Sequence, residues 1–219
     1  MFPGEFAVLH APVEAEEAGA AYAVHAALER LGAQNQAIGI GDPGDEVRQP
    51  IREALHRMEA EGWVDLRPSQ GAFVHVPTDT EVDHLLDVRV LLEAETARLA
   101  AAIPASAVKA AQLARLREIC REGKAAAEAD DFAGAVTINN TFHAEIAVIG
   151  GNTVLAELAH IVGRRVQWYY RMVAPERGHG SWEEHTELIE AIGAGDPALA
   201  REVARQHTER TREAYHRPR

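Results

Sequence analysis

The chain has 219 residues, of which 47% are hydrophobic, so it is long enough for one or two domains with real cores. Its formal net charge of -12 argues against indiscriminate nucleic-acid binding, and its single cysteine excludes an internal disulfide framework. We expect a cytoplasmic protein without a membrane span, because no apolar run could cross a bilayer and no secretory leader opens the chain.

The first part of the chain predicts two helices separated by a loop. Residues 15–32 are rich in alanine and end at Gly32, which favours a helix. Residues 33–46 are rich in glycine and are predicted as loop. Residues 48–61 predict the second helix, because Pro50 suits a first turn and apolar residues recur on one face.

A short hairpin is predicted next. Residues 63–67 and 72–76 alternate in polarity like strands, and Pro68-Ser69-Gln70-Gly71 between them is a typical hairpin tip. Thr78 or Asp79 then suits the N-cap of a following helix. We therefore place a domain boundary after Pro77 and expect two domains.

The second domain, residues 78–219, is predicted to be entirely helical. Apolar residues recur at spacings of three and four, and glycine or proline residues mark the breaks. Six helices are expected, two of them centred on residues 82–92 and 108–119 and the others near 130–149, 152–174, 181–194 and 196–215. The predicted fold class is mainly α, with a small β-hairpin in the first domain.

The helix that begins near Arg48 could read DNA. Its first turn presents Arg48, Gln49 and Arg52, and arginine and glutamine can pair with the major-groove edges of guanine and adenine. The hairpin could place Gln70 and Gly71 against the DNA backbone or the minor groove. The alternative is an ordinary solvated helix with charge pairs along its surface.

A family resemblance favours the DNA-reading alternative. The stretch RQPIREALHRMEAEGWVDLRPSQGAFV, residues 48–74, resembles the recognition helix and wing of the GntR family of bacterial repressors. The resemblance implies a winged helix-turn-helix in which Arg48 and Arg52 contact operator DNA and Gly71 lies at the tip of the wing. The chain departs from the family pattern at Val47, where a capping serine is usual, and the helix that normally precedes is not recognisable.

The helical domain contains a second cluster of interest. Asn139 and His143 are four residues apart and therefore share one helix face. His185 and His207 stand on the apolar faces of two later helices. A single inward histidine is more often a satisfied core residue than a ligand, but three on one bundle interior favour a site.

Residues 79–215 resemble the all-helical effector domain of the FadR subgroup of GntR repressors, called the FCD domain. The resemblance is carried by LLDVRVLLEAETARLAA (85–101), NNTFHAEIAVIGGN (139–152) and EEHTELIEAIGAGDPALA (183–200). Many members hold a divalent metal through Asp-x-x-x-His and two later histidines. His143, His185 and His207 match those histidines, whereas the neutral Asn139 stands at the aspartate position. This donor set suits Zn, Ni, Co or Mn. The alternative is an empty or weak site whose histidines bind the effector directly.

The resemblance also implies an effector and a mode of action. Members of the family bind a small organic acid near the metal, and Arg89 matches the position of an effector-facing arginine. Asn152 and Arg171 are further candidates for effector binding. We therefore predict a transcriptional regulator, typically a repressor, that acts as a homodimer on operator DNA and responds to a carboxylate metabolite.

Two other functions stay open on the sequence. A three-histidine metal site can activate water, so a metal-dependent hydrolase is one alternative. However, Glu145 and Glu184, which lie near the ligand positions, are not obvious general bases, and we expect no enzyme. The second alternative is a metabolite sensor that acts without DNA.

Overall fold

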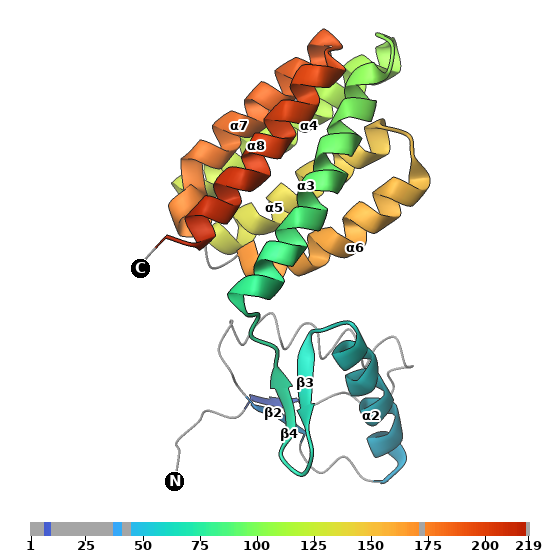
Figure 1. Cartoon of the computed structure of the whole chain (residues 1–219), viewed down its shortest axis with the longest axis vertical. Helices are drawn as coiled ribbons and strands as arrows, with labels where there is room; N and C mark the ends of the chain where they lie inside the picture. The colour runs from blue at the N-terminus through green and yellow to red at the C-terminus, as the bar shows by residue number, and fades with distance from the viewer. Residues whose placement is uncertain (1–6, 10–36, 41–44, 171–173, 218–219) are drawn as a thin grey trace. The chain divides into compact units, whose positions relative to one another are not determined.

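The computed structural model describes residues 7–9, 37–40, 45–170 and 174–217. The chain divides into two compact units, Met1–Pro77 and Thr78–Arg219. Among the described residues, we find no helix with the length and apolar character needed to cross a membrane. Figure 1 shows a small sheet beside helix α2 in the described part of the first unit and a helical bundle in the second.

The first unit contains a four-stranded sheet in the order β1-β2-β4-β3. Strand β1 (Ala7–Leu9) runs parallel to β2 (Ala37–Ile40), and β2 runs antiparallel to β4 (Gly71–Val74). Strand β3 (Val64–Arg67) pairs with β4 as an antiparallel hairpin. The hairpin confirms the two strands predicted from the alternation of polarity. The prediction of loop throughout residues 33–46 was wrong, because β2 lies within this segment.

Helix α2 (Asp45–Ala60) corresponds to the helix predicted at residues 48–61 and begins three residues earlier. Ala54, Leu55 and Met58 are buried on one face of α2, and Val64 at the start of β3 is buried with them. Apolar contact between α2 and β3 therefore fixes the helix against the sheet. The helix predicted at residues 15–32 lies outside the described residues.

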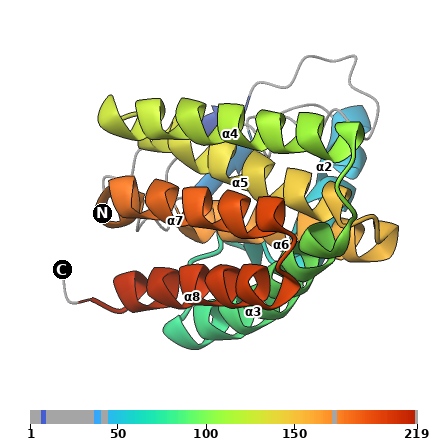
Figure 2. The same ribbon diagram turned by 90° about the horizontal axis from the view of Figure 1, so that it is seen from above.

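The second unit is built from six helices, as the apolar periodicity predicts. They are α3 (Asp79–Ala102), α4 (Ala107–Glu128), α5 (Phe132–Ile149), α6 (Thr153–Tyr170), α7 (Ala174–Ala194) and α8 (Pro197–Tyr215). Thr78 caps α3 and forms a capping box with Glu81, which confirms the predicted start of this helix. Helix α3 packs along α8 and also contacts α5, α6 and α7, and Figure 2 shows α3 and α8 side by side.

Helix α7 differs from the prediction of a break at residues 175–180 and a helix over residues 181–194. It begins at Ala174 and continues through a kink at Gly178, whose φ of 18° and ψ of -114° are not helical. Glycine marks this place in the sequence because it can adopt backbone angles that are sterically unfavourable for residues with a Cβ atom. Its effect is a kink within one helix rather than a loop between two.

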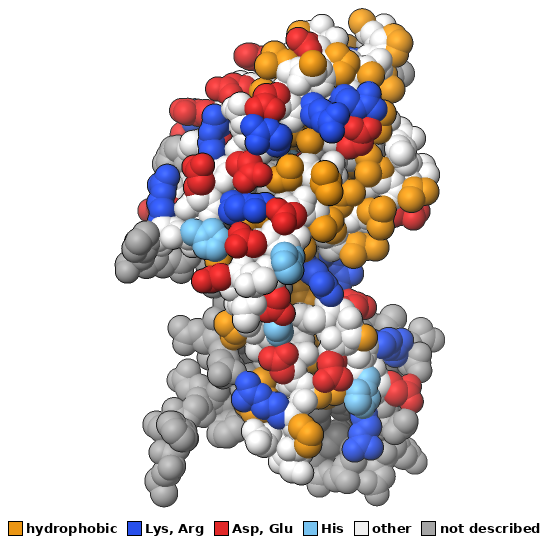
Figure 3. Space-filling view, in the orientation of Figure 1, with side chains coloured by type: hydrophobic (Ala, Val, Ile, Leu, Met, Phe, Trp, Pro, Cys, Tyr) orange, Lys and Arg blue, Asp and Glu red, His pale blue; other side chains and the backbone are white. Residues whose placement is uncertain are grey.

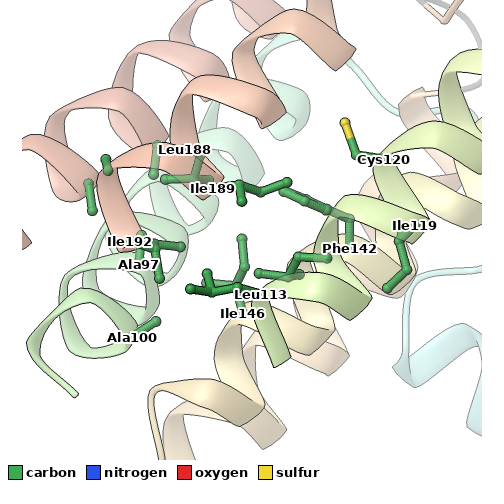
Figure 4. Packing of buried hydrophobic residues seen from close by; sticks show 14 of the residues in the cluster. Ala97, Ala100, Leu113, Ile119, Cys120, Phe142, Ile146, Leu188, Ile189 and Ile192 are labelled. Carbon is green, nitrogen blue, oxygen red and sulfur yellow. The ribbon is translucent and has the colours of Figure 1, made fainter. Parts of the chain in front are cut away.

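The core of the bundle joins α3, α4, α5, α7 and α8 (Figure 4). Leu116, Phe142 and Ile192 are fully buried, and the small residues Ala97 and Ala100 of α3 lie in the same cluster. Polar side chains of α3, α5, α7 and α8 lie within the bundle, and they form the candidate site.

Candidate metal and effector site

Three helices bring three histidines together inside the bundle. His143 comes from α5, His185 from α7 and His207 from α8, and one ring nitrogen of each lies within 4.8 Å of the others. The ring centroids are 4.7 Å apart for His185 and His207 and 5.1 Å apart for His143 and His185. His185 is 0% exposed and His207 is 1% exposed. The three histidines therefore lie together inside the bundle, as the sequence predicts.

Several polar atoms of this cluster have no hydrogen-bond partner among the described residues. They are the Nε2 atoms of His143, His185 and His207, the Nδ1 atom of His185, and Oδ1 of Asn139. Asn139 is buried one helical turn before His143, on the same face of α5. A buried polar atom without a partner destabilises the fold by about 1–3 kcal/mol. Imidazole nitrogens and an amide oxygen are donors that divalent transition metals accept, so these side chains fit a metal ion.

A carboxylate on α7 holds His207 in place. Oε2 of Glu184 lies 2.8 Å from Nδ1 of His207, and Arg177 donates to the other oxygen, Oε1, at 3.1 Å. Arg210 also pairs with Oε1 at 3.1 Å. Burial raises the pKa of Glu184, but the hydrogen bonds from His207 and Arg177 outweigh it and lower the value to about 2. An ionised Glu184 that accepts a hydrogen bond from the Nδ1–H group of His207 leaves Nε2 of His207 without a proton and facing the cluster.

A second carboxylate, Glu93 of α3, lies on the other side of the cluster. Nε of Arg89 donates to its Oε1 atom at 2.7 Å, and the Thr208 hydroxyl donates to Oε2 at 3.0 Å. Nδ1 of His143 lies 3.4 Å from Oε1. Two of the three histidines therefore have a carboxylate beside Nδ1, which is the usual arrangement behind metal-ligating imidazoles.

Burial keeps the three imidazoles neutral. It lowers the pKa of His143 and of His185 well below the ordinary value of 6.5. It also lowers the pKa of His207 to about 4, although the hydrogen bond to Glu184 opposes the change. Neutral imidazoles bind metal without first losing a proton, so protons compete little at pH 7.

These pKa values predict an acid-sensitive apoprotein. In the unfolded chain the histidines take up protons near pH 6.5, whereas in the folded chain His207 does so only near pH 4. Since the unfolded state binds more protons in this window, the free energy of unfolding should fall as the pH drops from about 6.5. Each histidine contributes up to about 1.4 kcal/mol per pH unit.

Urea unfolding of chelator-treated protein at pH 7, 6 and 5 measures this effect. Glu184 does not contribute within this window, because its lowered pKa removes stability only below about pH 4.5. Equal stability at pH 7 and pH 5 would mean that the three imidazoles accept protons in the folded state, contrary to their burial.

A small cavity adjoins the histidines between α3, α5 and α6. Arg89, Glu93, Asn140, His143 and Gly163 are among its lining residues, and its volume is about 20 Å³. This volume holds about one water molecule. Arg89 is 2% exposed, and its Nη1 atom has no partner in the described part of the chain. Arg89 therefore combines a buried charge with an available donor beside the histidine cluster.

The other two predicted effector residues are not part of this cluster. Asn152 is exposed, and its Oδ1 atom accepts from the backbone N–H of Leu155 at the start of α6. It lies outside the lining of the cavity. Arg171 lies outside the described residues.

The predicted DNA-reading residues lie in α2 and the hairpin. Arg48 and Gln49 belong to the first turns of α2, and the side chain of Arg52 is exposed one turn further along. Gln70 and Gly71 are exposed at the β3–β4 turn, where Gly71 has φ +104°, a conformation that favours glycine. The side chain of Arg52 and the hairpin tip are therefore both exposed at the surface of the described part of this unit.

Sequence reasoning missed the carboxylates that orient the histidines. Glu93 follows Arg89 by four residues, a spacing that signals an ion pair on one helix face. Glu184 was considered only as a weak candidate base, and nothing in the spacing of the sequence places it beside His207, which is 23 residues away. Arg177 has no sequence signal of its own: it lies next to the non-helical Gly178, and only the structure shows its contact with Glu184.

Comparison with known proteins identifies the helical unit. Residues 84–210 match the FCD domain, which covers more than half of the chain, so the chain belongs to the FCD domain family.

Two curated relatives are named as uncharacterized HTH-type transcriptional regulators. The relative from Streptomyces ambofaciens is 28% identical over 166 residues, 73% of this chain and 66% of its own length. The relative from Agrobacterium vitis is 30% identical over 96 residues, 44% of this chain and 56% of its own length. The matched region thus spans only about half to two thirds of the relatives.

Solved structures share the fold. E. coli McbR/YncC superposes with a TM-score of 0.72 at 18% identity, covering 89% of this chain and 94% of that protein. A putative GntR transcriptional regulator from Rhodococcus sp. RHA1 gives 0.71 at 19% identity, covering 90% and 94%. The FCD match assigns the helical unit to this family, and these two solved structures share the fold of the chain. Membership of the FadR subgroup stays a prediction.

Proposed function

We propose that this protein is a ligand-responsive transcriptional regulator whose helical unit senses a small carboxylate through a bound divalent metal ion. The observation that carries the proposal is the set of buried atoms without partners, namely Nε2 of three histidines and Oδ1 of Asn139. Buried polar atoms are hydrogen-bonded in the great majority of cases, so a cluster of unpaired ones indicates an ion, a ligand or water that satisfies them. The metal would supply a positive centre that attracts an anion.

The electrostatics of the interior support an anionic effector. Arg89 pairs with Glu93 and Arg177 pairs with Glu184, so these four buried charges cancel. The three imidazoles are neutral, and so is Asn139, which stands where the family pattern has an aspartate. A divalent cation would therefore bring an uncompensated double positive charge, and a carboxylate is the simplest group to offset it.

Arg89 is the residue we expect to hold the carboxylate. Its guanidinium is fixed at Nε by Glu93, which leaves Nη1 to donate to an anion in the adjoining cavity. The cavity holds about one water molecule, so a metabolite would have to displace the α6 residues that line it. A ligand that requires this displacement couples its binding to the position of α6, which is what a sensor needs.

We propose that α2 and the hairpin of the first unit read operator DNA. The support is the resemblance of residues 48–74 to the GntR recognition helix and wing, together with the exposure of Arg52 and Gln70. The acidic chain gains little non-specific attraction to DNA, so we expect binding to depend on base contacts and on two copies bound to an inverted repeat.

Selection from a random DNA pool tests this proposal. The full protein would be incubated with the pool at physiological salt, with and without zinc and a panel of small carboxylates, and the bound DNA sequenced. Enrichment of an inverted repeat whose occupancy changes with a carboxylate is the expected result. If no sequence is enriched under any condition, the protein does not act on DNA by itself.

Arg52→Ala should weaken binding to the selected operator by about 1–3 kcal/mol, because it removes one base contact per reading helix. The variant should also discriminate less between bases at the contacted position. Fluorescence anisotropy at fixed salt measures both effects. Arg98→Ala, which removes a partly exposed arginine of the helical unit, is the matched control and should bind normally. Equal losses in both variants would assign the effect to overall charge.

The hydrolase alternative receives no support from the site. Glu184 is ionised, but both its oxygens are engaged by His207, Arg177 and Arg210, so it is poorly placed to take a proton from water. Glu93 is similarly engaged by Arg89 and Thr208. Neither carboxylate is available as a general base.

A further inference from the structure

A second and larger pocket lies at one end of the bundle, between the start of α7 and the end of α8. Its volume is about 460 Å³, whereas the cavity beside the histidines measures about 20 Å³. Figures 1 and 2 show these two helix ends lying together. The residues that line the pocket include Arg177, Gly178, Gly180, Arg210, Glu213 and Arg217. We call this space the α7–α8 pocket.

Two arginines of the α7–α8 pocket share one carboxylate. Nη1 of Arg177 donates to Oε1 of Glu184 at 3.1 Å, and Nη1 of Arg210 lies 3.1 Å from the same oxygen. Two positive charges therefore meet one negative charge beside the pocket. An anion bound in the pocket would balance the charge of the second arginine.

Arg177 also carries a donor that the protein does not use. Its side chain is only 9% exposed, and its Nε atom has no hydrogen-bond partner in the described part of the chain. Buried donors are satisfied in the great majority of cases. An unsatisfied N–H group on a residue that lines a pocket therefore indicates a ligand or water that accepts from it.

We propose that the α7–α8 pocket binds a small molecule through a carboxylate or phosphate group. The fork of N–H donors on a guanidinium matches the paired oxygens of both groups, and Arg177 and Arg210 reach the pocket from different helices. The volume of the pocket lies within the range of about 300–1,000 Å³ that is common for small-molecule sites. The proposal goes beyond the proposed function, because neither the histidine cluster nor Arg89 takes part in it.

Two glycines of α7 keep the pocket open. A Cβ atom at Gly178 or at Gly180 would have no heavy atom within 4 Å beyond its local backbone. Both positions therefore face open space, and both line the α7–α8 pocket. A side chain at Gly180 would fill part of this space without the loss of an arginine. Gly178 is less suited to substitution, because its backbone angles are not helical.

The surroundings of the pocket favour a small anion over a polyanion. Residues 78–219 contain 17 Lys and Arg and 22 Asp and Glu, a net charge of -5. Figure 3 shows basic and acidic side chains interspersed on one face of the helical unit, so this face has no broad basic patch for nucleic acid or an anionic membrane. Glu176 and Glu213, two exposed carboxylates, also line the pocket and repel further negative charge. The pocket therefore suits a ligand with a single anionic group.

An anion in the α7–α8 pocket would act on the histidine cluster through Glu184. Oε2 of Glu184 lies 2.8 Å from Nδ1 of His207, while the two arginines bind the same carboxylate. An anion that draws an arginine away leaves Glu184 with fewer competing donors, so its hydrogen bond to His207 strengthens and the imidazole becomes a better metal ligand. This consequence rests on the proposed function, whereas the anion site itself does not.

Calorimetric titration of the metal-free full chain tests the proposal, with inorganic phosphate and succinate as separate probes at constant ionic strength. At least one of the two probes should bind to the native protein. Arg210→Ala should weaken that binding by about 10-fold or more, because it removes a hydrogen bond between charged groups. Arg205→Ala is the matched control and should leave the affinity unchanged, since Arg205 is an exposed arginine of α8 that pairs with Glu202 outside the pocket.

Gly180→Leu tests the pocket without the loss of a charge. The leucine should fill the space and abolish binding of the probe. Far-ultraviolet circular dichroism should show helix content at or above the native level, because glycine is a poor helix former. His185→Leu, which removes a proposed metal ligand, should bind the probe as tightly as the native protein does.

The probe that binds more tightly identifies the anionic group that the pocket takes. The proposal is overturned if neither probe binds, if Gly180→Leu and Arg210→Ala both bind as tightly as the native protein, or if Arg205→Ala loses as much affinity as Arg210→Ala. It is also overturned if binding requires zinc and disappears in His185→Leu, because the anion then lies at the histidine cluster and only the proposed function stands. If zinc does not bind but Gly180→Leu still abolishes binding of the probe, the proposed metal site fails and the α7–α8 pocket stands.

Discussion

The metal-free His185→Leu protein should be more stable than the metal-free native protein, and zinc should stabilise it less than it stabilises the native protein. His185 is 0% exposed, and neither of its ring nitrogens has a partner in the described part of the chain. An unsatisfied buried polar group costs about 1–3 kcal/mol, and a leucine of similar volume places no polar atom between Phe142 and Trp182. We expect the free energy of unfolding to rise by about 1–2 kcal/mol without metal.

The same substitution removes one of the proposed metal donors. Loss of a residue that only supports a metal ligand typically costs about 10–100-fold in metal affinity, and loss of the ligand itself should cost at least as much. The native protein should be stabilised by about 2.7 kcal/mol at a zinc concentration 100 times its dissociation constant, whereas the variant, which binds zinc at least about 10-fold more weakly, should be stabilised by about 1.4 kcal/mol or less. Urea unfolding with chelator and with zinc, together with calorimetric titration, measures both quantities.

A surface histidine provides the control for this experiment. His216→Leu removes an exposed imidazole that contacts Asp83, outside the bundle interior, and should leave zinc affinity unchanged. If zinc stabilises His185→Leu as much as the native protein, the three-histidine cluster is not a metal site. If the metal-free variant is less stable than the native protein, the packing of the ring against its neighbours outweighs its unpaired nitrogens.

The sequence predicted the helices of the bundle well because each carries its own signal. The apolar residues of α4 and α5 recur with the helical period, and Thr78 and Asp196 cap α3 and α8 as short polar residues do. Strand β2 was missed because four residues that include Gly39 and are followed by Gly41 resemble a loop in isolation. Its strand character depends on pairing with β1 and β4, which is not a local property.

The position of the histidine cluster was predictable from the sequence, but the residues that support it were not. The spacing of Asn139 and His143 on one helix and the resemblance to the FCD domain together placed the histidine cluster. The contact between Glu184 and His207 depends instead on how α7 packs against α8. Tertiary contacts of this kind leave no periodic trace in the sequence, and the supporting carboxylates could only be found in the structure.

Glu184→Gln should destabilise the metal-free protein by about 3–5 kcal/mol. The substitution keeps the shape of the side chain but removes the charge that compensates Arg177, which is only 9% exposed. Removing one partner of a buried pair leaves an uncompensated charge in a region of low dielectric constant, which accounts for the size of the effect. Glu202→Gln is the matched control, because Glu202 pairs with Arg205 on the surface and should change stability by less than about 1 kcal/mol.

A double substitution separates the structural role of Glu184 from its role toward His207. Arg177→Met/Glu184→Met removes both charges, so it should recover much of the stability lost in Glu184→Gln. It should not recover zinc affinity, which we expect to stay about 10–100-fold below the native value because Nδ1 of His207 loses its acceptor. If the double variant binds zinc as tightly as the native protein, Glu184 serves only to neutralise Arg177. In that case the orientation of His207 must come from the packing of α8.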